Sequence, residues 1–166
     1  MSPAAERLSR LVETADVTAV LYEYCSCVDA NRQRDVLDLF TDDAVYDHGH
    51  GRVFEGRARL GELFRALDEN VATSHHLSNV TVRFGADGMA YADSYVYAYH
   101  RRRVSGAEVH LWGRYADKLV RDGASWRIRN RTLLAAAESG VAPDAGWPSR
   151  YQLITRHDPD SDSRTL

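Results

Sequence analysis

The stretch from residue 90 to residue 100 constrains the fold more than any other part of the sequence, because its side chains alternate between two kinds. One set of positions carries small or aliphatic residues and a final histidine: Ala90, Ala92, Ser94, Val96, Ala98 and His100. The other set carries one aspartate and four tyrosines: Tyr91, Asp93, Tyr95, Tyr97 and Tyr99. A period of two residues indicates a β-strand with two unlike faces. The small side chains favour a curved sheet that wraps around other elements, and the tyrosine face is typical of packing or a subunit interface.

Helices are predicted before this strand. Apolar residues recur at the i, i+3, i+4 spacing of an amphipathic helix at Val17, Val20, Leu21, Tyr24, Cys25 and Val28. Pro3 predicts a separate short helix that reaches about Val12, and Thr14 is then a plausible N-cap for the second helix. Three further elements are predicted before the strands: a helix at 34–40, a short strand at 44–47 and a helix after Gly56.

The rest of the chain reads as an antiparallel meander. Turn signals lie at 85–88, 105–106 and 121–123, and they separate strands at 73–82, 90–100, 109–119 and 126–133. Helices and strands are therefore segregated, which predicts an α+β fold with a curved, mostly antiparallel sheet wrapped around N-terminal helices, as a cone-shaped α+β barrel. We expect this cone domain at 1–134, a C-terminal extension and candidate lid at 135–157, and a disordered polar tail at 158–166.

Length and composition exclude several classes of protein. The 166 residues suit a single domain, and a net charge of -3 gives no basic footprint for nucleic acid. No apolar run reaches membrane-spanning length, and the N-terminus lacks a signal-peptide core. Cys25 and Cys27 lie two apart in a predicted helix and cannot pair with each other, which favours the reducing cytoplasm.

No cofactor or metal is expected. The sequence has no Gly-rich nucleotide loop and no cysteine-histidine spacing for zinc. His48 and His50 could bind a metal, but a glycine-rich loop fixes ligands poorly and no third ligand is obvious nearby.

Two residues stand out as candidates for chemistry. On a strand His75, Leu77, Asn79 and Thr81 share one face, and His76 points to the other. A histidine held in a pocket is a good general base, while the alternative is a surface pair at a strand start. Asp29 ends the second helix, where the dipole disfavours a carboxylate; it is either a simple helix stop or is held there for a purpose.

Four short motifs carry a resemblance to a known family: Tyr24…Val28-Asp29, the run 39–46, His75-His76-Leu77-Ser78-Asn79 and Gly123…Trp126-Arg127-Ile128. In this order and spacing the chain resembles the SnoaL-like branch of the nuclear-transport-factor-2-like superfamily, over roughly 11–133. Within it the chain is most similar to a dehydratase group that includes scytalone dehydratase, bile-acid 7α-dehydratase and hexachlorocyclohexane dehydrochlorinase. These relatives use an Asp-His dyad inside the cone and form trimers.

The resemblance implies roles for five residues. Asp29 and His75 match the dyad, with His75 taking a proton from a carbon next to an activating group. Tyr24, five residues before the aspartate, or His100, at the place of a second histidine in scytalone dehydratase, would neutralise the leaving hydroxide. Arg131 would stabilise developing negative charge.

The resemblance thus predicts a cofactor-independent lyase of the dehydratase type. Its substrate would be a hydrophobic cyclic molecule, such as a steroid-like or polyketide-like compound or a cyclic ketone or alcohol. The expected substrate-binding residues are Tyr46, His48, Leu63, Leu67, Val96 and Asn79. The alternatives are a ketosteroid-isomerase-like or polyketide-cyclase-like proton-transfer enzyme and a non-catalytic small-molecule-binding module. We expect a homo-oligomer built on the tyrosine face, and a trimer rather than a dimer.

Overall fold

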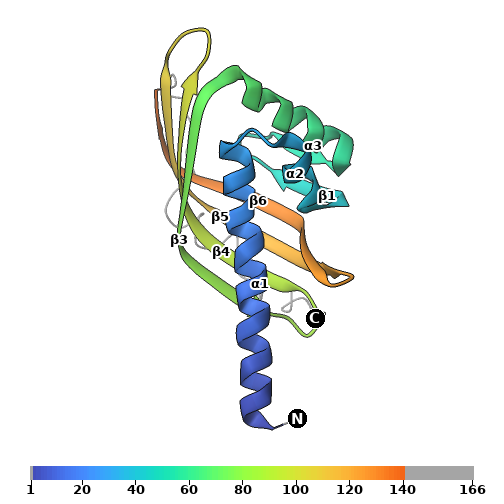
Figure 1. Ribbon diagram of the computed structural model, residues 1–166. Helices are drawn as coiled ribbons and strands as arrows, with labels where there is room; N and C mark the ends of the chain where they lie inside the picture. Colours follow the sequence, from blue (N-terminus) through green and yellow to red (C-terminus); the bar gives the residue numbers. More distant parts are fainter. Residues whose placement is uncertain (1, 141–166) are drawn as a thin grey trace, which may run out of the picture.

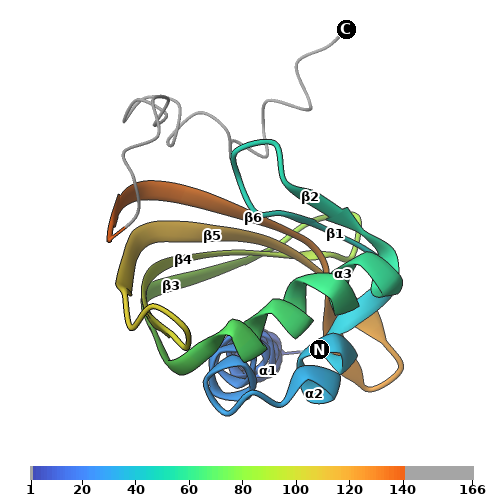
Figure 2. The same cartoon turned by 90° about the horizontal axis from the view of Figure 1, so that it is seen from above.

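The computed structural model describes residues 2–140, and within this range all helices lie on one side of a single curved sheet (Figures 1 and 2). The helical elements are α1 (Pro3–Asp29), α2 (Gln33–Asp38), α3 (Gly56–Arg65) and the 3-10 helix η1 (Ala66–Glu69). The strands are β1 (Phe40–Asp47), β2 (Val53–Glu55), β3 (Asn70–Phe84), β4 (Ala90–Arg102), β5 (Glu108–Asp122) and β6 (Ser125–Ser139). Their order in the sheet is β2-β1-β6-β5-β4-β3, with only the β1–β6 pair parallel among these strands. The α+β prediction is confirmed, although the sheet stays open instead of closing into a barrel.

The predicted alternation of β4 is confirmed and explains where the core lies. Ala90, Ala92, Ser94, Val96 and Ala98 are all buried on the face that α1 covers. On this face α1 packs against β3 and β6, and the small side chains of β4 lie on the concave side of the sheet, which curves around the helix (Figure 2). The long strands β5 and β6 continue this curvature beside β4.

The N-terminal helix is one helix and not two. α1 runs unbroken over 27 residues, and Thr14 lies in its middle. The Thr14 hydroxyl donates to the carbonyl of Arg10 at 2.8 Å, one turn back, as threonines inside helices do. Neither glycine nor proline interrupts the chain there, so the predicted break is wrong. The first turns of α1 project beyond the sheet (Figure 1), and Leu8 and Leu11 are exposed there.

Other boundaries differ by a few residues. The helix predicted at 34–40 is α2 at Gln33–Asp38, and Phe40 opens the longer strand β1. The short edge strand β2 was not predicted. β6 continues to Ser139, so the first five residues of the expected extension are strand; residues 141–157 of that extension and the tail 158–166 lie outside the described residues. Within residues 2–140, no helix is both long and apolar enough to cross a membrane.

β3 contains a bulge that changes which side chains face inward. Its pairing with β4 shifts between Ser78 and Thr81, and Asn79 has a left-handed φ of 51°. Beyond this point the side chains packed against the core are Val80, Val82 and Phe84. Asn79 and Thr81 are exposed. The prediction that they share the face of His75 is therefore wrong, because an extra residue exchanges the two faces of a strand.

Candidate active site

The end of α1 and the start of β3 meet through Asp29 and His75. One Asp29 carboxylate oxygen lies 2.7 Å from His75 Nδ1, and the other accepts the His75 backbone N–H at 2.8 Å. The predicted Asp29–His75 hydrogen bond is thus present. Two donors from β3 offset the unfavourable helix-end position of the carboxylate. Burial alone would raise the pKa of Asp29, but the hydrogen bonds from His75 outweigh it and the pKa is lowered.

This contact fixes the protonation of the His75 ring. An ionised carboxylate only accepts hydrogen bonds, so Nδ1 carries the proton that is shared with Asp29. Nε2 then has a free lone pair. The His75 side chain is 5% exposed and lines a cavity, whereas the Asp29 side chain is 28% exposed and lies behind it.

The cavity lies between the helices and the inner face of the sheet and has a volume of about 80 Å³. Its lining comes from α1, the β1 end, α3, η1 and strands β3 to β6: Tyr24, Val28, Tyr46, His48, Leu63, Phe64, Leu67, His75, Ala98, His100, Leu111, Tyr115 and Leu133. None of these described lining residues is Asp, Glu, Lys or Arg.

Three tyrosines line the cavity and separate it from a buried ion pair. Arg131 on β6 pairs with Asp117 on β5, its direct cross-strand neighbour, through Nε at 2.7 Å and Nη2 at 2.9 Å. Both side chains are 0% exposed. The guanidinium carbon lies 4.0 Å from the ring centre of Tyr24 and 4.3 Å from that of Tyr115. Burial raises the pKa of Tyr24, Tyr115 and Tyr46, so all three hydroxyls stay protonated.

Two further histidines line the cavity in neutral form. The ring of His100 meets that of His75 edge to face, with centres 5.1 Å apart. Burial, with the nearby His75, lowers the pKa of His100 to about 4. Burial and the Arg52 charge lower the pKa of His48 to about 4 as well. Arg52 Nη2 lies 2.9 Å from His48 Nδ1.

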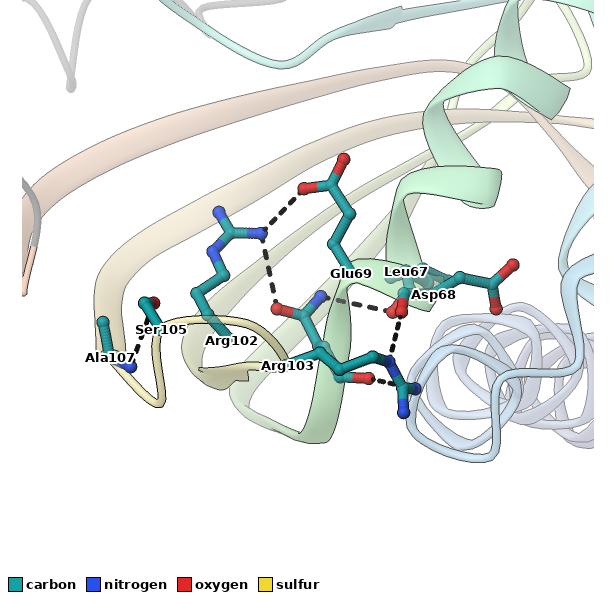
Figure 3. A network of polar contacts seen from close by, with 8 residues as sticks. Leu67, Asp68, Glu69, Arg102, Arg103, Ser105 and Ala107 are labelled. Carbon is teal, nitrogen blue, oxygen red and sulfur yellow. Dashed lines mark hydrogen bonds and ion pairs between the residues drawn. The ribbon is translucent and has the colours of Figure 1, made fainter.

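The wall formed by η1 is held by polar contacts from the β4–β5 loop (Figure 3). The Arg103 guanidinium donates to the backbone carbonyls of Asp68 and Asn70, each at 3.0 Å. The Arg103 backbone N–H donates to the backbone carbonyl of Glu69 at 2.7 Å. On the other side, Asn31 donates to the Asp68 carboxylate at 2.7 Å. These contacts hold in place the segment that carries Leu67, a cavity-lining residue.

Not every predicted site residue reaches the cavity. Tyr24, His75, His100, Tyr46, His48, Leu63 and Leu67 line it. Arg131 lies behind Tyr24 and Tyr115, and Asn79 is exposed at the bulge. Val96 does not line this cavity, because it packs in the core two residues before Ala98 on the same face of β4.

Sequence reasoning missed two residues that shape the site. Tyr115 and Asp117 follow the inward alternation of β5, in which Leu111, Gly113, Tyr115, Asp117 and Leu119 are all buried. A charged residue on an inward-facing position was the signal that could have identified Asp117 as a partner for a buried arginine. Among the described residues no group of three or more His, Cys, Asp or Glu is arranged to hold a metal ion.

Comparison with known proteins identifies the fold independently. The SnoaL-like domain family matches residues 9–132, and no curated protein matches the chain. A Novosphingobium aromaticivorans protein provisionally assigned as a scytalone dehydratase is 24% identical, covering 85% of this chain and 95% of its own, with a TM-score of 0.79. A second protein from that organism, provisionally assigned as an aromatic ring hydroxylase, is 26% identical, covering 79% and 94%, with a TM-score of 0.74. Hexachlorocyclohexane dehydrochlorinase LinA-type3 from Novosphingobium barchaimii LL02 is 14% identical, covering 86% and 99%, with a TM-score of 0.72.

Proposed function

Because the chain belongs to the SnoaL-like domain family, we propose that it is a cofactor-independent lyase that eliminates water, or a similar small group, from an uncharged hydrophobic molecule. The observation that carries the proposal is the Asp29–His75 hydrogen bond of 2.7 Å at the wall of an internal cavity. Two structures of similar fold are named for dehydration and dehydrochlorination, which are both eliminations.

His75 is the base. Its Nδ1 proton is held by Asp29, so Nε2 takes a proton from the substrate carbon next to an activating group. The negative carboxylate stabilises the imidazolium that forms. A base of this kind contributes roughly 100- to 10,000-fold to the rate.

The leaving group departs with a proton. Tyr24 and His100 both line the cavity and can donate a hydrogen bond to the departing hydroxide. Since the pKa of His100 is about 4, its ring is neutral near pH 7 and donates as an imidazole. The imidazolium of His75 then returns its proton, so that water leaves and the base is regenerated.

The lining selects against charged substrates. A carboxylate or phosphate would have no lysine or arginine partner among the described lining residues. The positive charge of Arg131 lies behind two tyrosine rings and is paired with Asp117. Arg131 holds Tyr24 and Tyr115 in place, and because Asp117 offsets part of its charge, it contributes only a weakened positive electrostatic potential to the cavity.

The substrate ring requires the cavity to expand. The volume is about 80 Å³, whereas a cavity of about 150 Å³ admits benzene. Leu63 and Leu67, which line the cavity from α3 and η1, are the flexible part of the lining, since the opposite wall is the paired sheet. A cyclic substrate therefore requires these two side chains to change rotamer, while η1 itself stays held by Arg103 and Asn31.

An isomerase or cyclase acting by proton transfer is the second candidate. A neutral His100 is a weaker acid than an imidazolium, and an isomerase needs no acid for a leaving group. The same His75 would move a proton between two carbons of a ketone. Variants of Tyr24 and His100 that retain full turnover would favour this reaction over elimination.

The proposal is tested with a panel of hydroxylated cyclic ketones and steroids, following loss of water by mass spectrometry. We expect His75→Ala to lower kcat by at least about 100-fold and Asp29→Asn to be similarly severe. His76→Ala is the matched control, because its ring lies against Tyr97 and outside the cavity, and it should change kcat by less than about threefold. Near wild-type turnover by His75→Ala, with the fold verified by circular dichroism, would refute the mechanism.

A further inference from the structure

We propose that His48 is a neutral hydrogen-bond donor in the cavity, locked by Arg52 in the tautomer that carries its proton on Nε2, and that it binds an acceptor oxygen of the substrate. This inference rests on the proposed function and names the group its substrate must carry, which is a carbonyl or similar acceptor oxygen. Arg52 is then a positioning residue and does not touch the substrate.

The β1–β2 hairpin brings the two side chains together. The backbone N–H of His48 donates to the carbonyl of Arg52 at 2.9 Å, so the two residues face each other across the turn. All three residues between them have left-handed φ values: 82° for Gly49, 53° for His50 and 75° for Gly51. This tight turn fixes the alignment that places Arg52 opposite His48. A longer loop would not hold the two residues in this alignment.

Donor and acceptor chemistry then sets the tautomer. A guanidinium has only donors, so the contact of 2.9 Å between Arg52 Nη2 and His48 Nδ1 requires Nδ1 to be the acceptor. The proton of a neutral ring must then be on Nε2. Nδ1 is occupied by Arg52, which leaves Nε2–H as the polar group that His48 can offer to the cavity it lines.

His48 and His75 are therefore held in opposite tautomers within one cavity. A carboxylate at Nδ1 of His75 leaves a basic Nε2, and a guanidinium at Nδ1 of His48 leaves an Nε2–H donor. Burial and the Arg52 charge, which lower the pKa of His48 to about 4, also keep this ring uncharged near neutral pH. The cavity thus contains a base and a neutral electrophile, as acid-base catalysis next to a carbonyl requires.

The pairing assigns a role in the reaction. His75 removes a proton from the carbon next to a carbonyl, and the electron pair of the broken C–H bond moves onto the carbonyl oxygen. The His48 Nε2–H stabilises the resulting enolate oxygen, and no proton transfer from His48 is needed. The electron pair then returns to form the C=C bond as the Cβ–O bond breaks, and the hydroxide takes the proton from the His75 imidazolium and leaves as water. The substrate class is consequently a β-hydroxy ketone, or another molecule whose leaving group is β to a carbonyl, rather than a halocarbon without oxygen.

The tautomer is tested directly on the ¹⁵N-labelled full-length protein with two-bond ¹H–¹⁵N correlation spectra near pH 7. We expect one neutral histidine with a protonated Nε2 and an unprotonated Nδ1, assigned to His48 by its loss in His48→Gln. Arg52→Met should raise the pKa of His48 and populate the Nδ1–H form, because both the charge and the donor are removed. Arg7→Met, at the exposed far end of α1 (Figure 1), is the control and should change neither property. An imidazolium or an Nδ1–H form in the wild type would overturn the inference whatever the turnover.

The acceptor preference is tested by binding cyclohexanone and its oxygen-free analogue methylenecyclohexane, followed by chemical-shift titration. We expect His48→Phe to weaken cyclohexanone binding roughly fivefold to tenfold, the effect of one hydrogen bond, and to change methylenecyclohexane binding by less than about twofold. His48→Gln retains an N–H near the Nε2 position and should largely restore cyclohexanone binding. Equal losses for both probes, or no binding of cyclohexanone to the wild type, would overturn the acceptor assignment. Failure of the proposed function is distinguishable, since it would appear as full turnover by His75→Ala with these titrations unchanged.

Discussion

Removing either partner of the Arg131–Asp117 pair is expected to destabilise the protein strongly. Both side chains are 0% exposed, and they share two hydrogen bonds of 2.7 and 2.9 Å. Breaking a buried pair from one side costs about 3–5 kcal/mol, because an uncompensated charge is left in the core. We expect Asp117→Asn near the lower limit, since the rings of Tyr24 and Tyr115 still face the guanidinium at 4.0 and 4.3 Å. Arg131→Met, which leaves a buried carboxylate, should lie in the same range.

The double variant Arg131→Met/Asp117→Leu should be less destabilised than the sum of the single variants. Replacing a whole buried pair by apolar side chains removes the desolvation penalty of both charges and is often neutral. We expect a coupling free energy of at least about 2 kcal/mol between the two positions, within the range seen for residues in contact.

Urea unfolding followed by far-ultraviolet circular dichroism measures these free energies. With a slope of about 2 kcal/mol per molar urea, a loss of 4 kcal/mol lowers the midpoint by about 2 M. Arg127 and Asp122 provide a matched control on the same two strands: their ion pair of 3.0 Å is exposed by 38% and 53%, so Arg127→Met should cost less than about 1 kcal/mol. Single variants at Arg131 or Asp117 that lose less than this, or a double variant with strictly additive losses, would refute the reasoning.

Three further outcomes are expected. Acid should destabilise the protein. The pKa values of His48 and His100 are about 4 in the folded state and about 6.5 in an unfolded chain, so the unfolded state binds more protons as the pH falls below about 6.5. Each histidine should therefore lower the free energy of unfolding by up to about 3 kcal/mol at pH 4. His100→Gln should lose less between pH 7 and pH 4.5 in urea titrations, and equal losses would contradict the assignment. The outer sheet face, where Tyr95 and Trp112 are 50% and 44% exposed, should be buried in a homo-oligomer, with a trimer favoured over a dimer. Trp112→Glu should weaken this oligomer. A wild-type monomer in sedimentation at micromolar concentration would disprove the prediction. Arg103→Ala should speed amide exchange across η1 several-fold, whereas the same change at exposed Arg101 should not, and unchanged exchange would show that the loop contacts do not hold this wall.

The sequence was informative about the fold where one local pattern had a single structural solution. The strict alternation of β4 indicated a strand with two unlike faces, and its small inward residues favoured a curved sheet that wraps around other elements. The boundary inside α1 was predicted wrongly because a threonine can cap a helix or lie within one. An N-cap contributes only about 1 kcal/mol, so a threonine alone does not decide whether a helix starts at it or runs through it. The bulge at Asn79 left no signal in the local pattern, because a one-residue register shift depends on the neighbouring strand.

The candidate site was predictable to the extent that it depends on motifs. Asp29 and His75 are 46 residues apart in the sequence, and their contact was predicted from the resemblance to a family. The partners that set protonation were less visible. Arg52 reaches His48 only because three consecutive left-handed residues close the β1–β2 turn, and Asp117 reaches Arg131 only through the register of β5 and β6. These contacts depend on how neighbouring strands are aligned, and that alignment cannot be read from the sequence alone.

The placement of charge around the cavity suits the proposed reaction on an uncharged substrate. The ionised residues Asp29, Arg52 and Arg131 each lie one layer behind a ring that lines the cavity and act on that ring rather than on the substrate. A charge inside the cavity would keep water bound and would have to be desolvated each time a hydrophobic substrate entered. A charge behind it orients a ring or fixes a tautomer while the surface that meets the substrate stays uncharged. The same arrangement makes the proposed catalytic groups sensitive to residues that never touch the substrate, so Arg52→Met and Asp29→Asn should alter the protonation of the lining rings without changing the shape of the cavity.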